Sequence, residues 1–275
     1  MLLKHLMPTK KYKVLSTLYN YTFYNTMKTI LITGATSGIG KSTAELLARQ
    51  GNRVIICGRR NEVLETLKTE LSLYTEILSL KFDVSNLEEV EQAISSLPED
   101  WKTIDVLINN AGNAHGLDPL SAGKTDDWDS MIDGNVKGLL YVSKMIIPSM
   151  KDRNSGHIVN ISSVAAKQTY ANGAVYCATK KAVDVISEGM RLELTEFGIK
   201  VTNIQPGAVE TDFSLVRFKG DSERASTVYA GYEALKAEDI ADAIAYCVNA
   251  PKHVMVSDMT IYPSAQSEPR TIYRK

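Results

Sequence analysis

The sequence predicts one α/β domain, a doubly wound Rossmann-type fold with a mostly parallel sheet of about seven strands and helices on both faces. From Lys28 onward, short apolar runs alternate with amphipathic stretches, a pattern typical of a parallel sheet. The run at residues 104–108 is apolar almost throughout, as expected for a strand that helices cover on both faces. No internal repeat or linker rich in proline and glycine divides the chain. We therefore expect a single domain over residues 27–275.

The expected elements follow one another in order along the chain. Short apolar runs predict strands at residues 29–33, 53–57, 75–82, 104–108, 157–161, 200–204 and 259–262. Amphipathic stretches between them predict helices at residues 38–50, 62–73, 87–97, 128–150, 174–197 and 237–247. The segment at about residues 213–235 interrupts this alternation after a strand end. It suits a lobe that covers the substrate, and a merely structural helical insert is the alternative.

The composition favours a protein that binds a small molecule. Of the 275 residues, 44% are hydrophobic and 23% charged, which allows a sizeable core. A net charge of −1 without a basic block over the folded region argues against nucleic-acid binding. Cys57, Cys177 and Cys247 are far apart and lack metal-ligand spacing, so we expect no disulfide framework, no metal site and a reducing, cytoplasmic setting. No apolar run approaches the length of a membrane span.

The first 26 residues differ in composition from the rest of the chain. They place four lysines among hydroxyl and aromatic side chains, and they lack the apolar core and small-residue cleavage site of a secretory signal. We expect a disordered extension or a translation start placed too early, because Met27 begins a chain that needs nothing before it. A targeting or interaction arm is the alternative.

A glycine-rich turn at residues 33–40, TGATSGIG, separates the first strand from the first helix. Backbone N–H groups of such a turn can bind a pyrophosphate at the positive end of the helix. The glycines follow the spacing G-x-x-x-G-x-G instead of the common G-x-G-x-x-G. The alternative is a tight turn that binds nothing. The cofactor-binding positions expected here are Gly34, Thr36, Ser37, Gly38 and Ile39.

The end of the second strand indicates NADP as the cofactor. It carries Gly58, Arg59 and Arg60 where a carboxylate would bind the ribose 2′-hydroxyl of NAD. Two guanidiniums can bind the 2′-phosphate of NADP, whereas solvated arginines would be poorly placed beside a positive helix end. Asp83, after the third strand, can accept a hydrogen bond from the adenine amino group or cap the next helix.

Tyr176, Lys180 and Ser163 predict a proton-transfer site around one carbonyl oxygen. Tyr176 and Lys180 are four residues apart and so share a face of a helix, while Ser163 precedes them from a strand end. A phenol with a pKa of about 10 is a poor base near neutrality unless a cation favours the phenolate. A tyrosine and a lysine at this spacing are also common on solvated helices, so the pair alone does not identify an enzyme.

Further motifs extend this pattern along the chain. The sequence NNAG at residues 109–112 follows the fourth strand, and Pro206 and Gly207 follow the sixth. Together with Ser163, Tyr176 and Lys180, they resemble the short-chain dehydrogenase/reductase family over residues 28 to about 263. The resemblance implies further cofactor contacts from Val84, Asn110, Pro206, Gly207, Val209 and Thr211.

The family resemblance also implies a mechanism. Hydride moves between the nicotinamide C4 and a carbinol carbon, while Tyr176 transfers the proton at the oxygen. Ser163 orients that oxygen, and Lys180 binds the nicotinamide ribose as well as favouring the phenolate. Asn135 is implied as the fourth catalytic position. The resemblance further implies a homotetramer built on the helices at residues 128–150 and 174–197.

Other stretches resemble a subgroup of NADP-dependent 3-hydroxy acid dehydrogenases. They are SLPEDW at residues 96–101, DW and MID within residues 127–133, VRFKGD at residues 216–221, and the end from Ile261 to Pro263 with Gln266. The subgroup acts on L-allo-threonine, serine and 3-hydroxypropionate, and its reverse reaction reduces malonic semialdehyde. Because these substrates carry a carboxylate, Arg217 is the candidate substrate-binding cation; a solvent-facing arginine is the alternative.

Two other interpretations stay open. The same fold and cofactor can serve a reductase of another carbonyl substrate, such as a ketone, a pterin or an acyl carrier. A non-catalytic NADP-binding regulator is less favoured, because all four catalytic positions are filled. We assign no catalytic role to His115 or His157, and we expect Trp101 and Trp128 to be packing residues.

Overall fold

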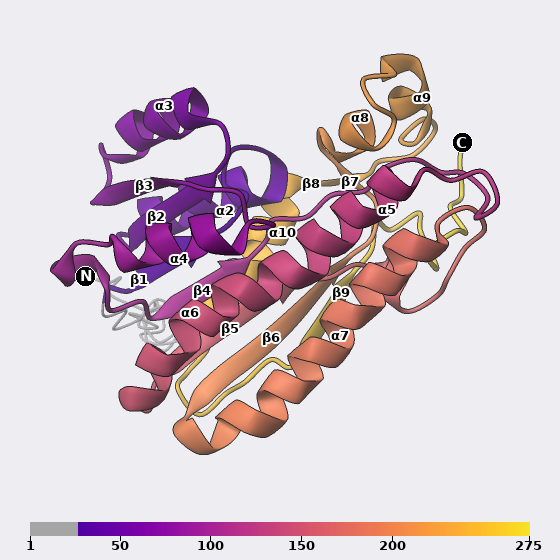
Figure 1. Cartoon of the computed structure of the whole chain (residues 1–275). Helices are drawn as coiled ribbons and strands as arrows, with labels where there is room; N and C mark the ends of the chain where they lie inside the picture. The colour runs from indigo at the N-terminus through magenta and orange to yellow at the C-terminus, as the bar shows by residue number, and fades with distance from the viewer. Residues whose placement is uncertain (1–26) are drawn as a thin grey trace, which may run out of the picture.

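A computed structural model describes residues 27–275, which fold around one seven-stranded sheet (Figure 1). The strand order is β3-β2-β1-β4-β5-β6-β9, and every neighbouring pair is parallel. The strands are β1 (Thr29–Ile32), β2 (Arg53–Gly58), β3 (Ile77–Lys81), β4 (Val106–Asn109), β5 (Gly156–Ile161), β6 (Ile199–Pro206) and β9 (Asp258–Ile261). The predicted fold class is confirmed. The extension at residues 1–26 lies outside the described residues.

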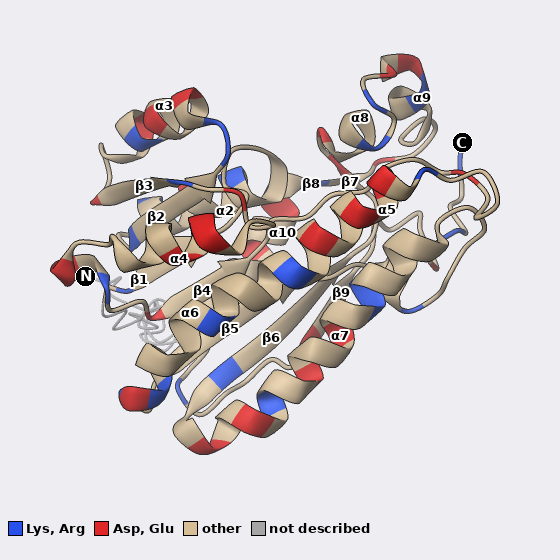
Figure 2. Cartoon of the chain, in the orientation of Figure 1, with Lys and Arg blue, Asp and Glu red and all other residues tan. Residues whose placement is uncertain are grey.

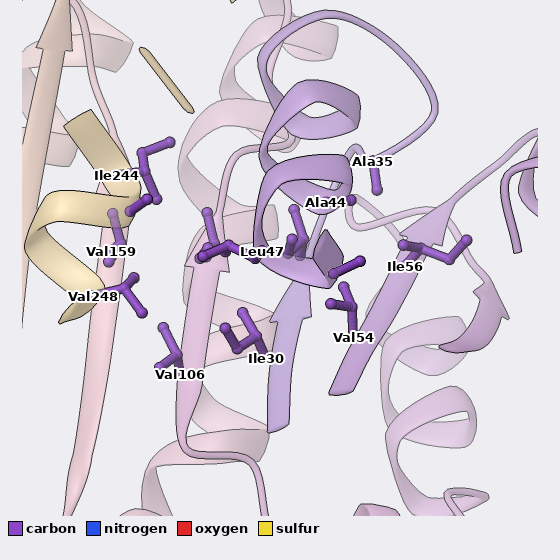
Figure 3. Close-up of a cluster of buried hydrophobic side chains, with 14 of the residues drawn as sticks. Ile30, Ala35, Ala44, Leu47, Val54, Ile56, Val106, Val159, Ile244 and Val248 are labelled. Atoms are coloured by element: carbon purple, nitrogen blue, oxygen red, sulfur yellow. The ribbon is translucent and has the colours of Figure 1, made fainter. Parts of the chain in front are cut away.

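Helices pack on both faces of this sheet. The first face is covered by α2 (Gly38–Arg49), α3 (Asn61–Leu71) and α10 (Ala237–Asn249), and the second by α4 (Leu87–Ser95), α6 (Gly138–Asp152) and α7 (Ala174–Leu194). Successive side chains of a strand point to opposite faces, so Ile30 and Ile32 join one core cluster while Leu31 joins the other. Figure 3 shows the first cluster, in which Leu47 of α2 and Ile244 of α10 meet the sheet.

The helix expected at residues 128–150 is interrupted in the structure. It consists of α5 (Thr125–Ile132), a π-helical segment η2 (Asp133–Lys137) and α6. A π-helical segment adds a residue to one turn and often marks a functional position. Here that segment carries Asn135, which is buried and hydrogen-bonds outside its own helix. The interruption was not predicted, because it depends on the contacts that Asn135 makes with Asn113 outside its own helix.

Smaller differences concern the ends of elements. The strand expected at residues 104–108 begins at Val106, and β3 is confined to five residues. The helix expected at residues 174–197 ends at Leu194 and continues as a 3-10 turn, η4 (Thr195–Phe197). Gly198 then takes a left-handed conformation with φ +66°, which ends the helix at little cost because glycine has no Cβ.

The segment after β6 forms a lobe beyond the carboxyl ends of the strands (Figure 1). It contains β7 (Val209–Glu210), α8 (Phe213–Arg217), α9 (Ser222–Thr227) and β8 (Leu235–Lys236). Two short helices occupy the segment that was expected to be either a substrate-covering lobe or a structural helical insert. The parallel β7-β8 pair that closes the lobe was not predicted, because strands of two residues give no periodic signal. The hydroxyl of Tyr229 ties the lobe together by lying 2.8 Å from Ser214 Oγ and donating to Val209 O at 2.9 Å.

Side chains of both charge signs are mixed on the outer face of α7 (Figure 2).

The two tryptophans pack against other side chains. Trp101 is 7% exposed and packs under the guanidinium of Arg53, whose carbon lies 4.1 Å from the ring centroid. Trp128 packs against the cluster that includes Met131, so the prediction of two packing tryptophans is confirmed. Between residues 27 and 275, no helix has the length and apolar character needed to cross a membrane.

Candidate active site

A cavity of about 1420 Å³ opens at the carboxyl ends of the parallel strands, where open α/β sheets bind their ligands. Every cofactor-binding residue expected from the sequence lines it, as do Ser163, Tyr176, Lys180 and Arg217. The residues expected to bind the cofactor, all of which line the cavity, are Gly34, Thr36, Ser37, Gly38, Ile39, Arg59, Arg60, Asp83, Val84, Asn110, Pro206, Gly207, Val209 and Thr211. The sheet thus gathers residues from the whole length of the described chain into one site.

The glycine-rich turn is shaped by close backbone approach. Gly34 and Gly38 have φ of +65° and +51°, in the left-handed region that favours glycine. A Cβ on Gly40 would collide with the carbonyl of Gly34 and the amide of Asn110, so this helical position has to be glycine. The side chain of Ser37 makes no capping hydrogen bond to α2, and the first turn of this helix carries no acidic residue. The N-terminus of α2 therefore offers backbone donors to an anion.

The two arginines after β2 lie at the same mouth of the cavity. Arg60 Nη2 donates to Thr36 O at 3.0 Å and to Thr36 Oγ1 at 2.9 Å, which fixes this side chain beside the glycine-rich turn. Arg59 Nη1 lies 3.4 Å from Asp83 Oδ2, and its side chain is 74% exposed. Burial opposes ionisation of Asp83, but hydrogen bonds from Ser85 and the charge of Arg59 outweigh it and lower the pKa of this carboxyl. Asp83 is thus an acceptor beside two cations.

Tyr176 is a buried titratable group at the other end of the cavity. It is 8% exposed, and burial raises the pKa of its phenol, while the Ser163 hydroxyl and the Arg217 charge act in the opposite direction. Ser163 directly follows β5 and stands as the N-cap of the short 3-10 turn η3 (Val164–Ala166). Its Oγ accepts a hydrogen bond from the backbone N–H of Ala165 at 3.1 Å, which fixes the hydroxyl near Tyr176.

Lys180 follows Tyr176 by one turn of α7 and is 6% exposed. Its Nζ donates to Ile161 O at 3.0 Å and lies 6.0 Å from the centroid of the Tyr176 ring. Burial lowers the pKa of this ammonium to about 8, against the opposing charge of Asp184. Lys180 therefore holds its charge at neutral pH and loses it as the pH rises past about 8.

Asn135 does not line the cavity but fixes the residues that do. Its Oδ1 accepts from Asn113 N at 2.7 Å, and its Nδ2 donates to Asn113 O at 2.8 Å and to Thr179 Oγ1 at 3.0 Å. A Cβ on Gly112 would lie 3.0 Å from Asn135 Oδ1 and 3.3 Å from Lys180 Nζ. The loop after β4, the π-helical segment and α7 thus meet at Asn135, beside the lysine.

Arg217 reaches into the cavity from α8 instead of facing solvent. Its Nε donates to Gly116 O and its Nη1 to the Tyr170 hydroxyl, both at 3.2 Å. Its guanidinium carbon lies 5.5 Å from the ring centroid of Tyr176 and 5.7 Å from that of Tyr170. A guanidinium at this place puts positive charge next to the phenol.

Sequence reasoning missed several residues of this end of the cavity. Tyr170 accepts a hydrogen bond from Arg217, and the guanidinium carbon of Arg270 lies 5.2 Å from the Tyr170 ring centroid. Phe213 packs on Tyr176, with 5.7 Å between the ring centroids. These contacts join the loop before α7, the lobe and the C-terminal segment. For Tyr170 the available signal was an aromatic residue six positions before Tyr176, and no local signal pointed to Phe213 or Arg270.

The two histidines differ in their environment. His157 Nε2 lies 2.8 Å from Thr202 Oγ1, and burial lowers the pKa of this imidazole to about 3. It sits at the start of β5 and does not line the cavity. His115 does line the cavity, and burial lowers its pKa despite the charge of Asp127. Among residues 27–275, no group of three or more potential ligand side chains is arranged to hold a metal ion.

Comparison with known proteins agrees with this geometry. A family model described as short chain dehydrogenase matches residues 28–221. The chain belongs to this family. The short-chain dehydrogenase fold accounts for the parallel sheet, the glycine-rich turn and the site at the strand ends, and the protein is an oxidoreductase that acts on hydroxyl groups.

Similar members of the family are named for their substrates. The NADP-dependent 3-hydroxy acid dehydrogenase YdfG of Salmonella typhi is 44% identical over 239 residues, covering 86% of this chain and 96% of the relative. The NADP-dependent 3-hydroxy acid dehydrogenase of Schizosaccharomyces pombe is 41% identical over 251 residues, covering 90% and 97%. A structure described as the closed form of serine dehydrogenase complexed with NADP+ superposes with a TM-score of 0.84 at 41% identity, covering 90% and 100%.

Proposed function

We propose that this short-chain dehydrogenase transfers hydride between NADP and the 3-hydroxyl carbon of small 3-hydroxy acids. The substrate class comprises L-allo-threonine, serine and 3-hydroxypropionate, with malonic semialdehyde as the substrate of the reverse reaction. The observation that carries the proposal is the position of Arg217, a cation 5.5 Å from the Tyr176 ring in the same cavity. The names of the similar proteins support the same substrate class.

The residues at the glycine-rich mouth fit NADP. The uncapped N-terminus of α2 suits the pyrophosphate, and the two arginines after β2 suit the 2′-phosphate. Arg60 is already held against Thr36, so only Arg59 has to leave its exposed contact with Asp83 to bind a phosphate oxygen. Asp83 then remains available as an acceptor for the adenine amino group. When bound, NADP supplies the hydride acceptor or donor at the nicotinamide C4.

Tyr176 transfers the proton at the substrate oxygen in this proposal. In the oxidation direction the phenolate accepts the hydroxyl proton, and in the reduction direction the phenol donates it. Lowering the pKa of a phenol from about 10 to near neutrality requires about 3 to 4 kcal/mol, and the burial of Tyr176 adds to that requirement. The positive charges of Lys180 and Arg217 and the hydrogen bond from Ser163 are the groups that can offset it.

The remaining roles follow from position. Ser163 donates to the reacting oxygen and fixes its place beside Tyr176, while Lys180 holds positive charge and binds the nicotinamide ribose. Arg217 binds the substrate carboxylate, with Gly116 and Tyr170 holding the guanidinium in orientation. Asn135 holds the loop after β4 against α7 through its hydrogen bonds to Asn113 and Thr179, and it supports a proton relay through water.

The assembly and location are part of the proposal. Apolar side chains such as Leu140 on α6 and Val185 and Leu192 on α7 are 41%, 57% and 81% exposed, which suits burial between the helices of a homotetramer. Three free, buried cysteines suit a reducing compartment such as the cytoplasm. The mass of the protein in solution, measured by light scattering, tests the tetramer.

The test of the activity is a substrate panel followed through the absorbance of NADPH. We expect turnover with NADP and L-serine, L-allo-threonine or 3-hydroxypropionate, and much weaker turnover with NAD or with alcohols that lack a carboxylate. Turnover confined to alcohols without a carboxylate would assign the site to another carbonyl substrate. Tight NADP binding without turnover of any compound in the panel would favour a regulator.

A further inference from the structure

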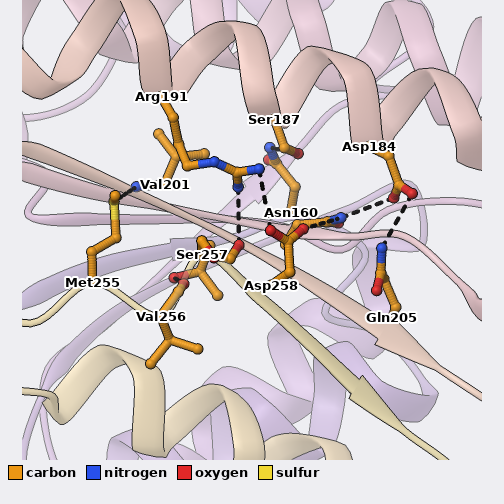
Figure 4. A network of polar contacts seen from close by, with 12 residues as sticks. Asn160, Asp184, Ser187, Arg191, Val201, Gln205, Met255, Val256, Ser257 and Asp258 are labelled. Atoms are coloured by element: carbon orange, nitrogen blue, oxygen red, sulfur yellow. Dashed lines mark hydrogen bonds and ion pairs between the residues drawn. The ribbon is translucent and has the colours of Figure 1, made fainter.

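A network of buried polar side chains connects α7 to the sheet behind the catalytic residues (Figure 4). Asp184 is its member nearest to Lys180 in sequence. Asp184 Oδ1 accepts from Asn203 Nδ2 at 2.8 Å, and its Oδ2 accepts from Gln205 Nε2 at 3.1 Å. The hydroxyl of Ser162 lies 2.8 Å from Asp184 Oδ1. The Asp184 side chain is 15% exposed, so its carboxylate is largely removed from water.

The charge of Asp184 needs an explanation beyond attachment of the helix. Elsewhere the same helix is tied to β5 by a pair of neutral side chains, where Asn160 Nδ2 donates to Ser187 Oγ at 2.9 Å. Burying a carboxylate costs more free energy than burying an amide, unless a nearby positive charge compensates it. The cation within 4 Å of Asp184 is Lys181, whose Nζ is 3.9 Å away on a 63% exposed side chain. Such an exposed pair contributes little.

Lys180 is the buried cation on the same face, because it precedes Asp184 by one turn of α7. The Ser162 hydroxyl lies 2.9 Å from the backbone carbonyl of Lys180, so one side chain of the sheet contacts both residues. Among the titratable neighbours of Lys180, Tyr176 lies on α7 at 6.0 Å, and Asp184 is the carboxylate that acts on it.

Asp184 is the carboxylate whose charge acts on Lys180, whereas the Asp133 carboxylate of the π-helical segment pairs with Lys137 at 2.7 Å. The π-helical segment presents the amide of Asn135, and β5 presents the carbonyl of Ile161. From the lobe, the cation Arg217 lies 5.5 Å from the Tyr176 ring centroid and adds no negative charge to this region. Asp184 is therefore the group on this part of the chain that can compensate the buried ammonium.

We propose that Asp184 is a positioning residue for the dehydrogenase reaction, which keeps the Lys180 ammonium charged and holds its turn of α7 against β5 and β6. The inference rests on the proposed function. It assigns a task to a residue outside the cavity, since Asp184 is not among the cavity-lining residues. Asn203 and Gln205 hold the Asp184 carboxylate in place with neutral amide groups. The negative charge of Asp184 is therefore retained and can stabilise the positive charge of Lys180.

The test is the pH profile of the reduction of malonic semialdehyde at saturating NADPH. This direction requires a protonated Tyr176 and a charged Lys180, so kcat/KM falls at high pH as Lys180 loses its proton. In Asp184→Asn we expect the midpoint of this fall to move to lower pH by about half a unit or more, because a partly buried neighbouring charge is lost. Below the fall, kcat should stay within about threefold of wild type.

Asp258→Asn is the matched control. Asp258 Oδ1 accepts from the same Asn203 Nδ2 at 3.1 Å and also pairs with Arg191 at 3.3 Å, eleven residues beyond Lys180 on α7. Both substitutions should lower the melting temperature, but only Asp184→Asn should move the pH profile. Asp184→Glu, which retains the charge, should restore the wild-type midpoint.

The outcomes separate this inference from the proposed function. A wild-type midpoint in Asp184→Asn, or an equal shift in Asp258→Asn, would overturn the role of Asp184 while leaving the dehydrogenase intact. Absence of activity in the wild-type protein would instead refute the proposed function. Asp184→Ser also removes the charge and serves as the second variant if Asp184→Asn does not fold.

Discussion

The two ends of the cavity are built in different ways. At the cofactor end, the phosphate-binding region is expected to consist of backbone groups of one turn and two arginines, which lie within residues 33–40 and 58–60. At the substrate end, side chains from distant segments meet. Arg217 contacts Gly116, 101 residues away, and Tyr170, 47 residues away, and Tyr170 in turn packs under Arg270 of the C-terminal segment.

This difference has a physical consequence for tolerance to change. The cofactor end depends on the absence of Cβ atoms and on a helix N-terminus, so few residue types can occupy it. The substrate end depends on which side chains the lobe and the C-terminal segment bring together. Members of one family can therefore share the first end and differ at the second, which makes the substrate end the place where specificity is set.

The largest effect is expected from Gly40→Ala at the cofactor end. The added Cβ would press on the backbone carbonyl of Gly34 and on Asn110, so the turn has to open. We expect NADP affinity to fall by more than about tenfold and the protein to lose about 1 to 3 kcal/mol of stability. Calorimetric titration with NADP and thermal unfolding measure the two effects.

Gly189→Ala provides the control for this substitution. Gly189 also lies in a helix, α7, but a Cβ there would meet no atom within 4 Å. Replacing it should leave NADP binding unchanged, because it lies outside the cavity. Equal NADP affinity in Gly40→Ala and wild type would show that the cofactor end does not depend on close backbone approach.

Arg217→Gln is expected to give the next largest effect, at the substrate end. Loss of a charge-assisted hydrogen bond to the carboxylate should raise KM for 3-hydroxy acids by about 10- to 100-fold, with little change in the Kd of NADPH. Steady-state kinetics with L-serine and 3-hydroxypropionate measure this. Arg224→Gln is the matched control, because Arg224 packs on Phe218 in the same lobe and does not line the cavity. Unchanged kinetics in Arg217→Gln would remove the carboxylate role.

The close backbone packing that limits substitution at the cofactor end also makes this end predictable from the sequence. Gly34, Gly38 and Gly40 occupy fixed spacings within one strand-turn-helix unit, and such local constraints are visible as a motif. The succession of strands and helices along the chain also followed from the alternation of apolar runs and amphipathic stretches. The interruption at Asn135 did not, because it depends on contacts with Asn113 and not on the periodicity of the helix.

The substrate end could be predicted only in part. Arg217 was singled out because a carboxylate substrate requires a cation, and its orientation into the cavity is set by Gly116 and Tyr170. Nothing local in the sequence links Tyr170 to Arg217 or to Arg270. Such pairs depend on how the lobe and the C-terminal segment fold over the strand ends, which is a property of the whole chain.

Arg59→Gln should have a smaller effect, confined to the choice between NADP and NAD. We expect NADP affinity to fall by about tenfold and NAD affinity to stay within about twofold, because one charged contact to the 2′-phosphate is lost. Arg49→Gln is the control, since Arg49 ends α2 and packs over Tyr74, away from the cavity. Equal losses for NADP and NAD in Arg59→Gln would place this guanidinium elsewhere than at the 2′-phosphate.

Tyr170→Phe should give the smallest effect and test whether the substrate end acts as a unit. The ring remains, but Arg217 Nη1 loses its acceptor at 3.2 Å, so the guanidinium is held less firmly. Arg217 keeps its other hydrogen bond, to Gly116 O, so we expect a loss of about 1 kcal/mol in orientation, which corresponds to a KM increase of about two- to tenfold for 3-hydroxy acids. If Tyr170 acts through Arg217, the same substitution in an Arg217→Gln background should change KM no further. Additive effects in the double variant would mean that Tyr170 contacts the substrate directly.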